Sequence, residues 1–172
     1  MQIKDYDFFA YWPNYKKYSS IDYRDHAIDH ISYLLEEGCP LNVEDFLKKL
    51  KESFEYGLYQ YFAVIINDEN DLIYITDLHY YDYSLTKNMS ASTIIKLCNE
   101  NSLGCNIMTE NNFIHLLLAW NNIRNQLSPF ALLYLDDKDW YDVLPFQTQE
   151  EMEQFIKAEI IYEQYNFSER NK

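Results

Sequence analysis

The sequence predicts an α+β fold: an antiparallel sheet built from two β-hairpins, with helices packed on it. Apolar runs rich in β-branched and aromatic residues, typical of strands, occur in pairs around acidic turns at 68–71 and 136–139. Stretches with apolar residues at the 3.6-residue period predict amphipathic helices before and after each pair. Helices that flank hairpins in this way are expected to cover one face of the sheet.

The N-terminal segment, residues 1–18, is expected to form a short edge strand or an aromatic arm over the core. Its large apolar side chains before Pro13 are Ile3, Phe8, Phe9, Tyr11 and Trp12. Ser19 or Ser20 is expected to cap the first helix, and Asn42 the second. The expected helices cover residues 21–37, 42–56, 90–101, 110–126 and 149–165, and the expected strands cover 58–66, 72–78, 105–108 and a hairpin within 130–146.

The last hairpin and the helix after it are the most strongly marked unit. An apolar strand begins at Phe130, an acidic turn follows, and Pro145 stops the second strand. Thr148 and Glu151 have the spacing in which a hydroxyl and a carboxylate each accept a hydrogen bond from the other residue's backbone N–H at a helix start. The tail, residues 167–172, is expected to fray.

One domain over residues 1–172 is the expectation from chain length, and an apolar content of 48% suffices for a substantial core. The hairpin sequences that begin at Phe62 and Phe130 align without a gap, which predicts an αββα repeat with units of about 42–101 and 109–166. Chance similarity between two amphipathic hairpins explains so short a match equally well. If the repeat is real, the two hairpins are expected to join into one sheet.

The composition is strongly acidic: 28 Asp and Glu residues against 14 Lys and Arg residues give a formal charge of −14. Such a field repels nucleic-acid phosphates and anionic membranes, so direct binding to either is not expected. A basic protein is the natural complement, and acidity that only maintains solubility is the plain alternative. Three glycines supply no glycine-rich phosphate loop.

Cysteine use and the N-terminus predict a reduced, cytoplasmic protein. Cys39, Cys98 and Cys105 are odd in number and form no Cys-x-x-Cys pair. The N-terminus is too acidic for a signal peptide, and no apolar run approaches the length of a membrane span.

No motif predicts catalysis, a bound metal or a cofactor. His26 and His30 have the four-residue spacing of zinc sites, but Asp29 stands where the inverted metalloprotease pattern has Glu, and both histidines are expected to face solvent. Asp136 and Asp137 are more typical of a wet hairpin turn than of a glycosidase-like pair, which needs one carboxyl group in an apolar pocket. A small-molecule substrate is therefore not expected.

Carboxylates interleaved with aromatic residues are the feature that points to a function. Tyrosine and tryptophan supply rigid contact area, and carboxylates bind lysine and arginine through charge-assisted hydrogen bonds. Together they suit a surface that blocks a cationic cleft, such as a nuclease active site, although an AT-rich genome also produces a tyrosine excess. The predicted partner-binding residues are Tyr80, Tyr81, Asp82, Tyr83, Asp136, Asp137, Asp139, Trp140, Tyr141 and Asp142.

In size, acidity and tyrosine content, the chain resembles the immunity proteins that bacteria make against contact-dependent and other polymorphic toxins. The resemblance covers about the last third, with the hairpin Leu132-Leu-Tyr-Leu-Asp-Asp-Lys-Asp-Trp-Tyr-Asp-Val-Leu-Pro-Phe146 and the helical segment Glu150-Glu-Met-Glu-Gln-Phe155. It implies a non-catalytic antitoxin that occludes a basic toxin domain in the producer's cytoplasm. Two alternatives stay open: a phage or mobile-element inhibitor that mimics nucleic acid against a host defence protein, and an enzyme with buried carboxylates or a metal at His26 and His30.

Overall fold

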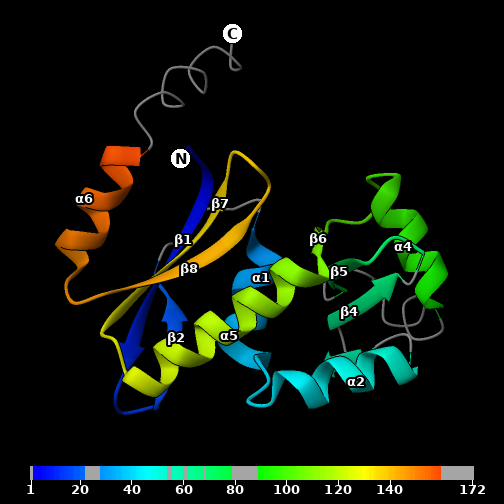
Figure 1. Ribbon diagram of the computed structural model, residues 1–172, viewed down its shortest axis with the longest axis horizontal. Helices are drawn as coiled ribbons and strands as arrows, with labels where there is room; N and C mark the ends of the chain where they lie inside the picture. Colours follow the sequence, from blue (N-terminus) through cyan, green and yellow to red (C-terminus); the bar gives the residue numbers. More distant parts are fainter. Residues whose placement is uncertain are drawn as a thin grey trace, which may run out of the picture. The chain divides into compact units, whose positions relative to one another are not determined.

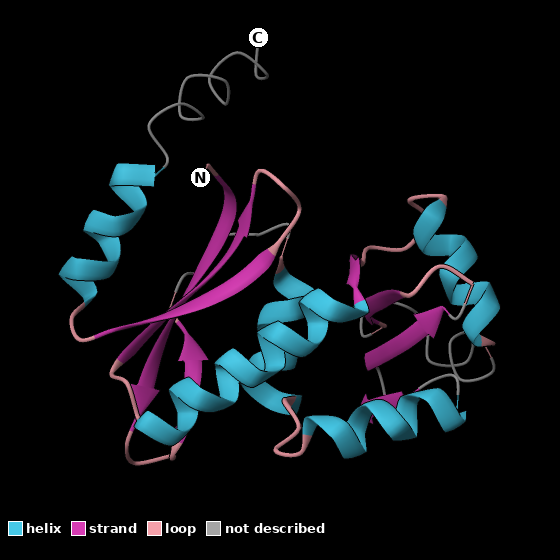
Figure 2. Cartoon of the chain, in the orientation of Figure 1, coloured by secondary structure: helices cyan, strands magenta, loops and turns pink. Residues whose placement is uncertain are grey.

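The computed structural model describes residues 2–21, 28–53, 56–59, 62–67, 69–78 and 89–159. These residues form helices and two four-stranded antiparallel sheets, which confirms the predicted α+β class (Figures 1 and 2). The chain divides into two compact units, a terminal unit (Met1–Ile28 and Ala119–Lys172) and a central unit (Asp29–Leu118). One domain over residues 1–172 stays a prediction, because the division does not decide whether the units fold independently.

The terminal unit contains β1 (Ile3–Trp12), β2 (Lys17–Ser20), the end of α5 (Glu110–Gln126), β7 (Phe130–Asp136), β8 (Tyr141–Phe146) and α6 (Gln149–Glu159). Its strands have the order β2-β1-β7-β8. On one face, Met152 and Ile156 of α6 belong to a buried cluster with Leu132 of β7. Phe9 meets Trp120 of α5 at a ring-centroid distance of 5.0 Å. Phe8 packs on the face that α6 covers. Successive side chains of a strand point to opposite faces, so Phe9 and the Trp120 that it meets lie on the other face of the sheet.

The N-terminal segment is a central strand, so the expected edge strand or arm is wrong. β1 lies between β2 and β7, and it pairs with β7 from Ile3, opposite Asp136, to Ala10, opposite Phe130. Because β7 lies far away in the sequence, the local pattern of the N-terminal segment cannot predict this pairing. Ser19 and Ser20 belong to β2, so they cap no helix.

The central unit contains α1 (Asp29–Tyr33), the π-helix η1 (Leu34–Gly38), α2 (Val43–Ser53), β3 (Tyr56–Tyr59), β4 (Phe62–Asn67), β5 (Leu72–Asp77), α4 (Ala91–Asn99), β6 (Asn106–Thr109) and the start of α5. Its strands have the order β3-β4-β5-β6. Ile94 and Cys98 of α4 belong to a buried cluster with Ile65 of β4 and Tyr74 of β5. Of the first predicted helix, residues 22–27 lie outside the described residues, Ile21 and Ile28 are not helical, and the rest forms α1 and its continuation η1.

Each predicted hairpin belongs to a different sheet, so the expected single sheet is wrong. β4 and β5 pair in the central unit, and β7 and β8 pair in the terminal unit. The run 58–66, which predicts one strand, instead divides between β3 and β4, and these pair antiparallel with Tyr59 opposite Phe62.

The gapless repeat fails at the turn. Asn67 pairs with Leu72 across the first turn, whereas Leu135 pairs with Tyr141 across the second turn, which is one residue longer. A shift of one residue turns every later side chain to the opposite face of a strand. The second strands of the two hairpins are therefore not equivalent position by position.

Helix starts are confirmed where a polar side chain caps them. The Ser90 hydroxyl accepts the backbone N–H of Thr93 at 3.2 Å, before α4. The Glu151 N–H donates to Thr148 Oγ1 at 3.1 Å, and the Thr148 N–H donates to Glu151 Oε2 at 3.3 Å, which is the predicted reciprocal cap. Helix α5 has the predicted bounds. In the part of the chain that the structure describes, no helix has both the length and the apolar character needed to cross a membrane.

Candidate partner-binding tip

Six of the ten predicted partner-binding residues lie in the turn between β7 and β8 and at its ends; we call this segment, residues 136–142, the acidic tip. Asp136 is only 9% exposed, and its Oδ1 accepts the backbone N–H groups of Lys138 at 2.8 Å and Trp140 at 2.9 Å. The Asp136 N–H donates to the Trp140 carbonyl at 3.0 Å, and the Asp139 N–H donates to the Asp136 carbonyl at 3.2 Å. Asp139 has a left-handed φ of 60°, which aspartate tolerates better than most residues. These bonds fix the conformation of the turn.

The N-terminus adds a second attachment to the acidic tip. The Asp137 N–H donates to the Gln2 carbonyl at 2.8 Å, and the Gln2 N–H donates to Asp137 Oδ1 at 3.3 Å. Lys4 Nζ donates to Asp139 Oδ1 at 2.7 Å. The bond from Gln2 holds the pKa of the Asp137 carboxyl below its usual value, and the bond to Asp139 raises the pKa of the Lys4 ammonium group. Asp137 is therefore fully charged at neutral pH.

The exposed side chains of the tip form a small set. Asp137 and Asp139 lie at the surface, and Trp140 is 36% exposed. Asp136 and Tyr141 are buried, and their role in partner binding stays a prediction. Asp136 is buried because it holds the turn, and Tyr141 is buried because it begins strand β8.

The Asp142 carboxylate accepts two hydrogen bonds at the open edge of strand β8. Its Oδ2 accepts the Tyr134 hydroxyl at 3.4 Å, and its Oδ1 accepts the Val143 N–H at 2.8 Å. In the β7–β8 ladder, the backbone nitrogens of Tyr141, Val143 and Pro145 face the open edge; the Val143 N–H is already bonded to Asp142, and proline carries no N–H. This leaves few backbone donors along the open edge for an added strand.

The structure does not bring the other predicted site residues together into a site. Tyr80, Tyr81, Asp82 and Tyr83 lie outside the described residues, as does His26. His30 is half-buried, and a Cβ added at Gly104 would lie 3.1 Å from its Nε2. Within the described ranges, no group of three or more His, Cys, Asp or Glu side chains could hold a metal ion.

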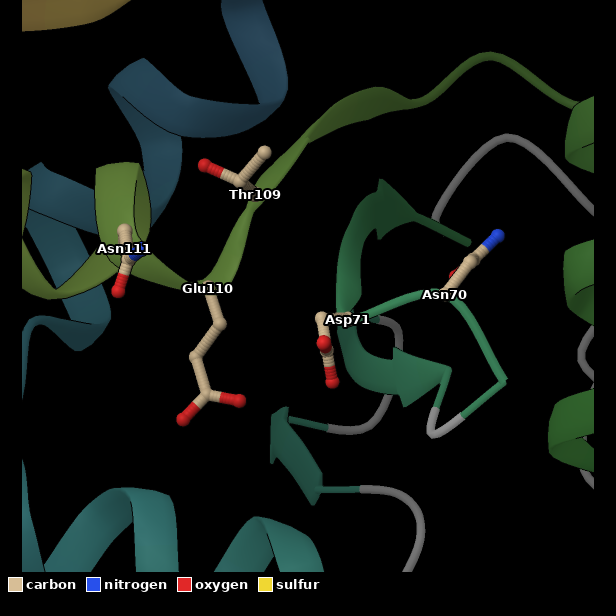
Figure 3. Close-up of a pocket in the computed structure, with 5 residues that line it drawn as sticks. All are labelled: Asn70, Asp71, Thr109, Glu110 and Asn111. Carbon is tan, nitrogen blue, oxygen red and sulfur yellow. The ribbon is translucent and has the colours of Figure 1, made fainter.

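The central unit also contains a hollow of about 450 Å³. Figure 3 shows Asn70 and Asp71, from the turn before β5, on one side, and Thr109, Glu110 and Asn111, where β6 meets α5, on the other. Its polar groups serve local structure: Lys51 Nζ pairs with Glu110 Oε1 at 2.6 Å, and the Glu110 N–H donates to the Asp71 carbonyl at 3.0 Å. These bonds tie the start of α5 to α2 and to the turn before β5.

Sequence reasoning missed Gln2, just before β1, and Lys4, within β1, which attach the N-terminal segment to the tip. Their sequence neighbours carry no signal for this role, because it depends on β1 pairing with β7. A comparison with family models, curated proteins and solved structures finds no match to this chain.

Proposed function

We propose that this protein is a non-catalytic inhibitor that binds a basic protein domain through its acidic tip. From the resemblance to bacterial immunity proteins, we infer that the partner is a toxin domain, such as a nuclease, and that the inhibitor acts in the cytoplasm of the cell that makes the toxin. The observation that carries the proposal is an exposed anionic and aromatic turn whose backbone is already fixed before any partner binds.

Preorganisation favours binding because a partner need not order the turn. The Asp136 carboxylate accepts two amide N–H groups within the turn, the Asp137 N–H donates to the Gln2 carbonyl, and the Gln2 N–H donates to Asp137 Oδ1; together these bonds hold the backbone of the tip. Association loses affinity when loops and side chains must be ordered at an interface. A tryptophan between carboxylates, on a backbone that is held by hydrogen bonds, matches the aromatic and charged residues that dominate binding energy at interfaces.

Charge gives the tip its expected preference for a basic partner. Residues 136–142 contain four aspartates and one lysine, in a chain with a formal charge of −14. Complementary charges raise association rates and disfavour wrong partners more than they raise affinity itself. Screening over roughly 8 Å at physiological salt confines the specific part of this effect to groups near the contact.

An inhibitor that mimics nucleic acid against a host defence protein would use the same chemistry, and it is the principal alternative. It differs in its expected partner and gene neighbourhood: a prophage or mobile element instead of a toxin cassette. An enzyme with buried carboxylates is less well supported. Asp7 is 1% exposed and accepts the Ser20 hydroxyl at 2.8 Å, and Asp136 holds the tip, so both carboxylates have structural partners.

The test is co-purification from the native operon with a matched pair of variants. One variant carries Asp137→Asn, Asp139→Asn and Trp140→Ala at the tip. The control carries Asp45→Asn, Glu52→Gln and Leu41→Ala, at exposed positions in the central unit, and so makes the same change in charge and also removes one exposed apolar side chain.

The proposal expects a basic protein that is retained by the wild type and by the control variant and lost by the tip variant. Identification of that protein as the toxin encoded beside this gene supports the immunity role, and a host defence protein supports the alternative. A partner that the tip variant retains as well as the wild type does would overturn the assignment of the tip. Turnover of a substrate by the purified protein would overturn the non-catalytic role.

A further inference from the structure

Two of the three cysteines lie together in the core of the central unit. Cys98, in the last turn of α4, is 3% exposed and belongs to the buried cluster that includes Ile94 and Leu103. Cys105, just before β6, is half-buried and packs against the same cluster. The two thiol groups interact, because each is the largest influence on the pKa of the other.

The backbone on both sides holds the two cysteines in place. After α4, the N–H groups of Ser102 and Leu103 donate to the Leu97 carbonyl at 2.9 and 3.2 Å, which closes the loop tightly. Before β6, the Gly104 carbonyl accepts the Thr76 hydroxyl at 2.7 Å. Hydrogen bonds therefore hold the backbone next to both cysteines.

The environments of the two thiols differ in a way that assigns them different roles. Donation of its hydrogen bond to Cys105 and burial both raise the pKa of Cys98. The bond that Cys105 accepts lowers the pKa of Cys105. Since the thiolate is the nucleophile, Cys105 combines the greater thiolate fraction with the greater access to solvent. An accessible thiol of low pKa beside a second cysteine is the usual arrangement of a redox-sensitive pair.

We propose that Cys98 and Cys105 form a reversible dithiol–disulfide pair, in which Cys105 reacts first with a small disulfide oxidant and Cys98 resolves the product. With oxidised glutathione, the Cys105 thiolate attacks one sulfur, the glutathione S–S bond breaks, and one glutathione thiolate leaves. The Cys98 thiolate then attacks Cys105 Sγ, the mixed disulfide breaks, and a second glutathione thiolate leaves. The two cysteine protons go to the two glutathione thiolates, so glutathione is reduced and the protein dithiol is oxidised.

The experiment uses the full chain with Cys39→Ser, which leaves Cys98 and Cys105 as its only thiols. The folded protein is incubated with oxidised glutathione, remaining thiols are alkylated, and the intact mass is measured. We expect the loss of two hydrogen atoms and no alkylation, with full reversal by dithiothreitol. Cleavage after Glu100, which lies between the two cysteines, should then leave two peptides that separate only on reduction.

Two further variants in the same background test the assigned roles. Cys98→Ser should accumulate a stable glutathione adduct on Cys105, while Cys105→Ser should react at least about tenfold more slowly in the folded state, because Cys98 is buried. The rate at which each thiol reacts with oxidised glutathione is also measured in urea, where the chain is unfolded. A variant that reacts equally fast with and without urea has lost its fold. Two alkylated thiols, or a mixed disulfide that persists in the Cys39→Ser protein, would overturn the proposed pair; faster reaction at Cys98 than at Cys105 would overturn the assigned order.

Discussion

Replacing Asp136 with alanine should destabilise the protein by about 2 kcal/mol, although the residue opens a surface turn. The Asp136 carboxylate accepts hydrogen bonds from the Lys138 and Trp140 amides at 2.8 and 2.9 Å. A hydrogen bond to a charged group contributes roughly 1.5–3 kcal/mol. Lys138 and Trp140 are exposed, so water can replace part of the lost acceptor. Two bonds at the low end of that range, partly offset by hydration, give the expected magnitude.

Urea unfolding measures this change as a lower midpoint with an unchanged slope. Asp136→Asn keeps an Oδ1 acceptor without the charge and should cost about half as much. The matched control is Asp139→Asn, which removes charge from a side chain that is 80% exposed and paired with Lys4. Exposed pairs contribute little, so this change should stay within about 0.5 kcal/mol. Equal midpoints for Asp136→Ala and Asp139→Asn would refute a structural role for the Asp136 carboxylate.

Three further predictions concern stability. Trp120→Ala removes a fully buried indole that packs on Phe9 and Tyr18, and it should cost about 3–5 kcal/mol in thermal unfolding; a loss below about 1 kcal/mol would contradict the packing. Thr148→Ala removes the cap of α6 and should cost about 1 kcal/mol in urea, whereas Thr148→Ser should be nearly neutral. Burial raises the pKa of Tyr18 and of Tyr134 to about 12, and the unfolded chain releases these protons near pH 10. Stability should therefore hold below about pH 10 and fall between about pH 10 and 12, and a variant with phenylalanine at both positions should show a shallower fall.

Local patterns predicted the elements whose signals lie within one stretch of sequence. The bounds of α5 follow from a continuous apolar stripe, and the start of α6 follows from the spacing of Thr148 and Glu151. Strand character at Phe130 and Tyr141 was equally visible, because β-branched and aromatic residues surround an acidic turn.

Pairing over long sequence separations was not predictable in this way. β1 reads as an edge segment from its own residues, but its position opposite β7 makes it central. The same pairing brings Gln2 and Lys4 to the acidic tip, so the residues that fasten the candidate site were missed. The tip itself was predicted from composition, whereas the burial of Tyr141 follows from strand alternation beyond the turn.

The most direct test of the central claim is the association rate of the co-purified basic partner, measured by stopped flow as a function of salt. For the wild type, we expect the rate to fall at least about tenfold between low and high ionic strength. Asp137→Asn with Asp139→Asn should lower the rate at low salt and flatten its salt dependence, while Asp45→Asn with Glu52→Gln should leave both unchanged. Association that is insensitive to salt, or equal rates for the two variants, would contradict an inhibitor that finds its partner through an acidic tip.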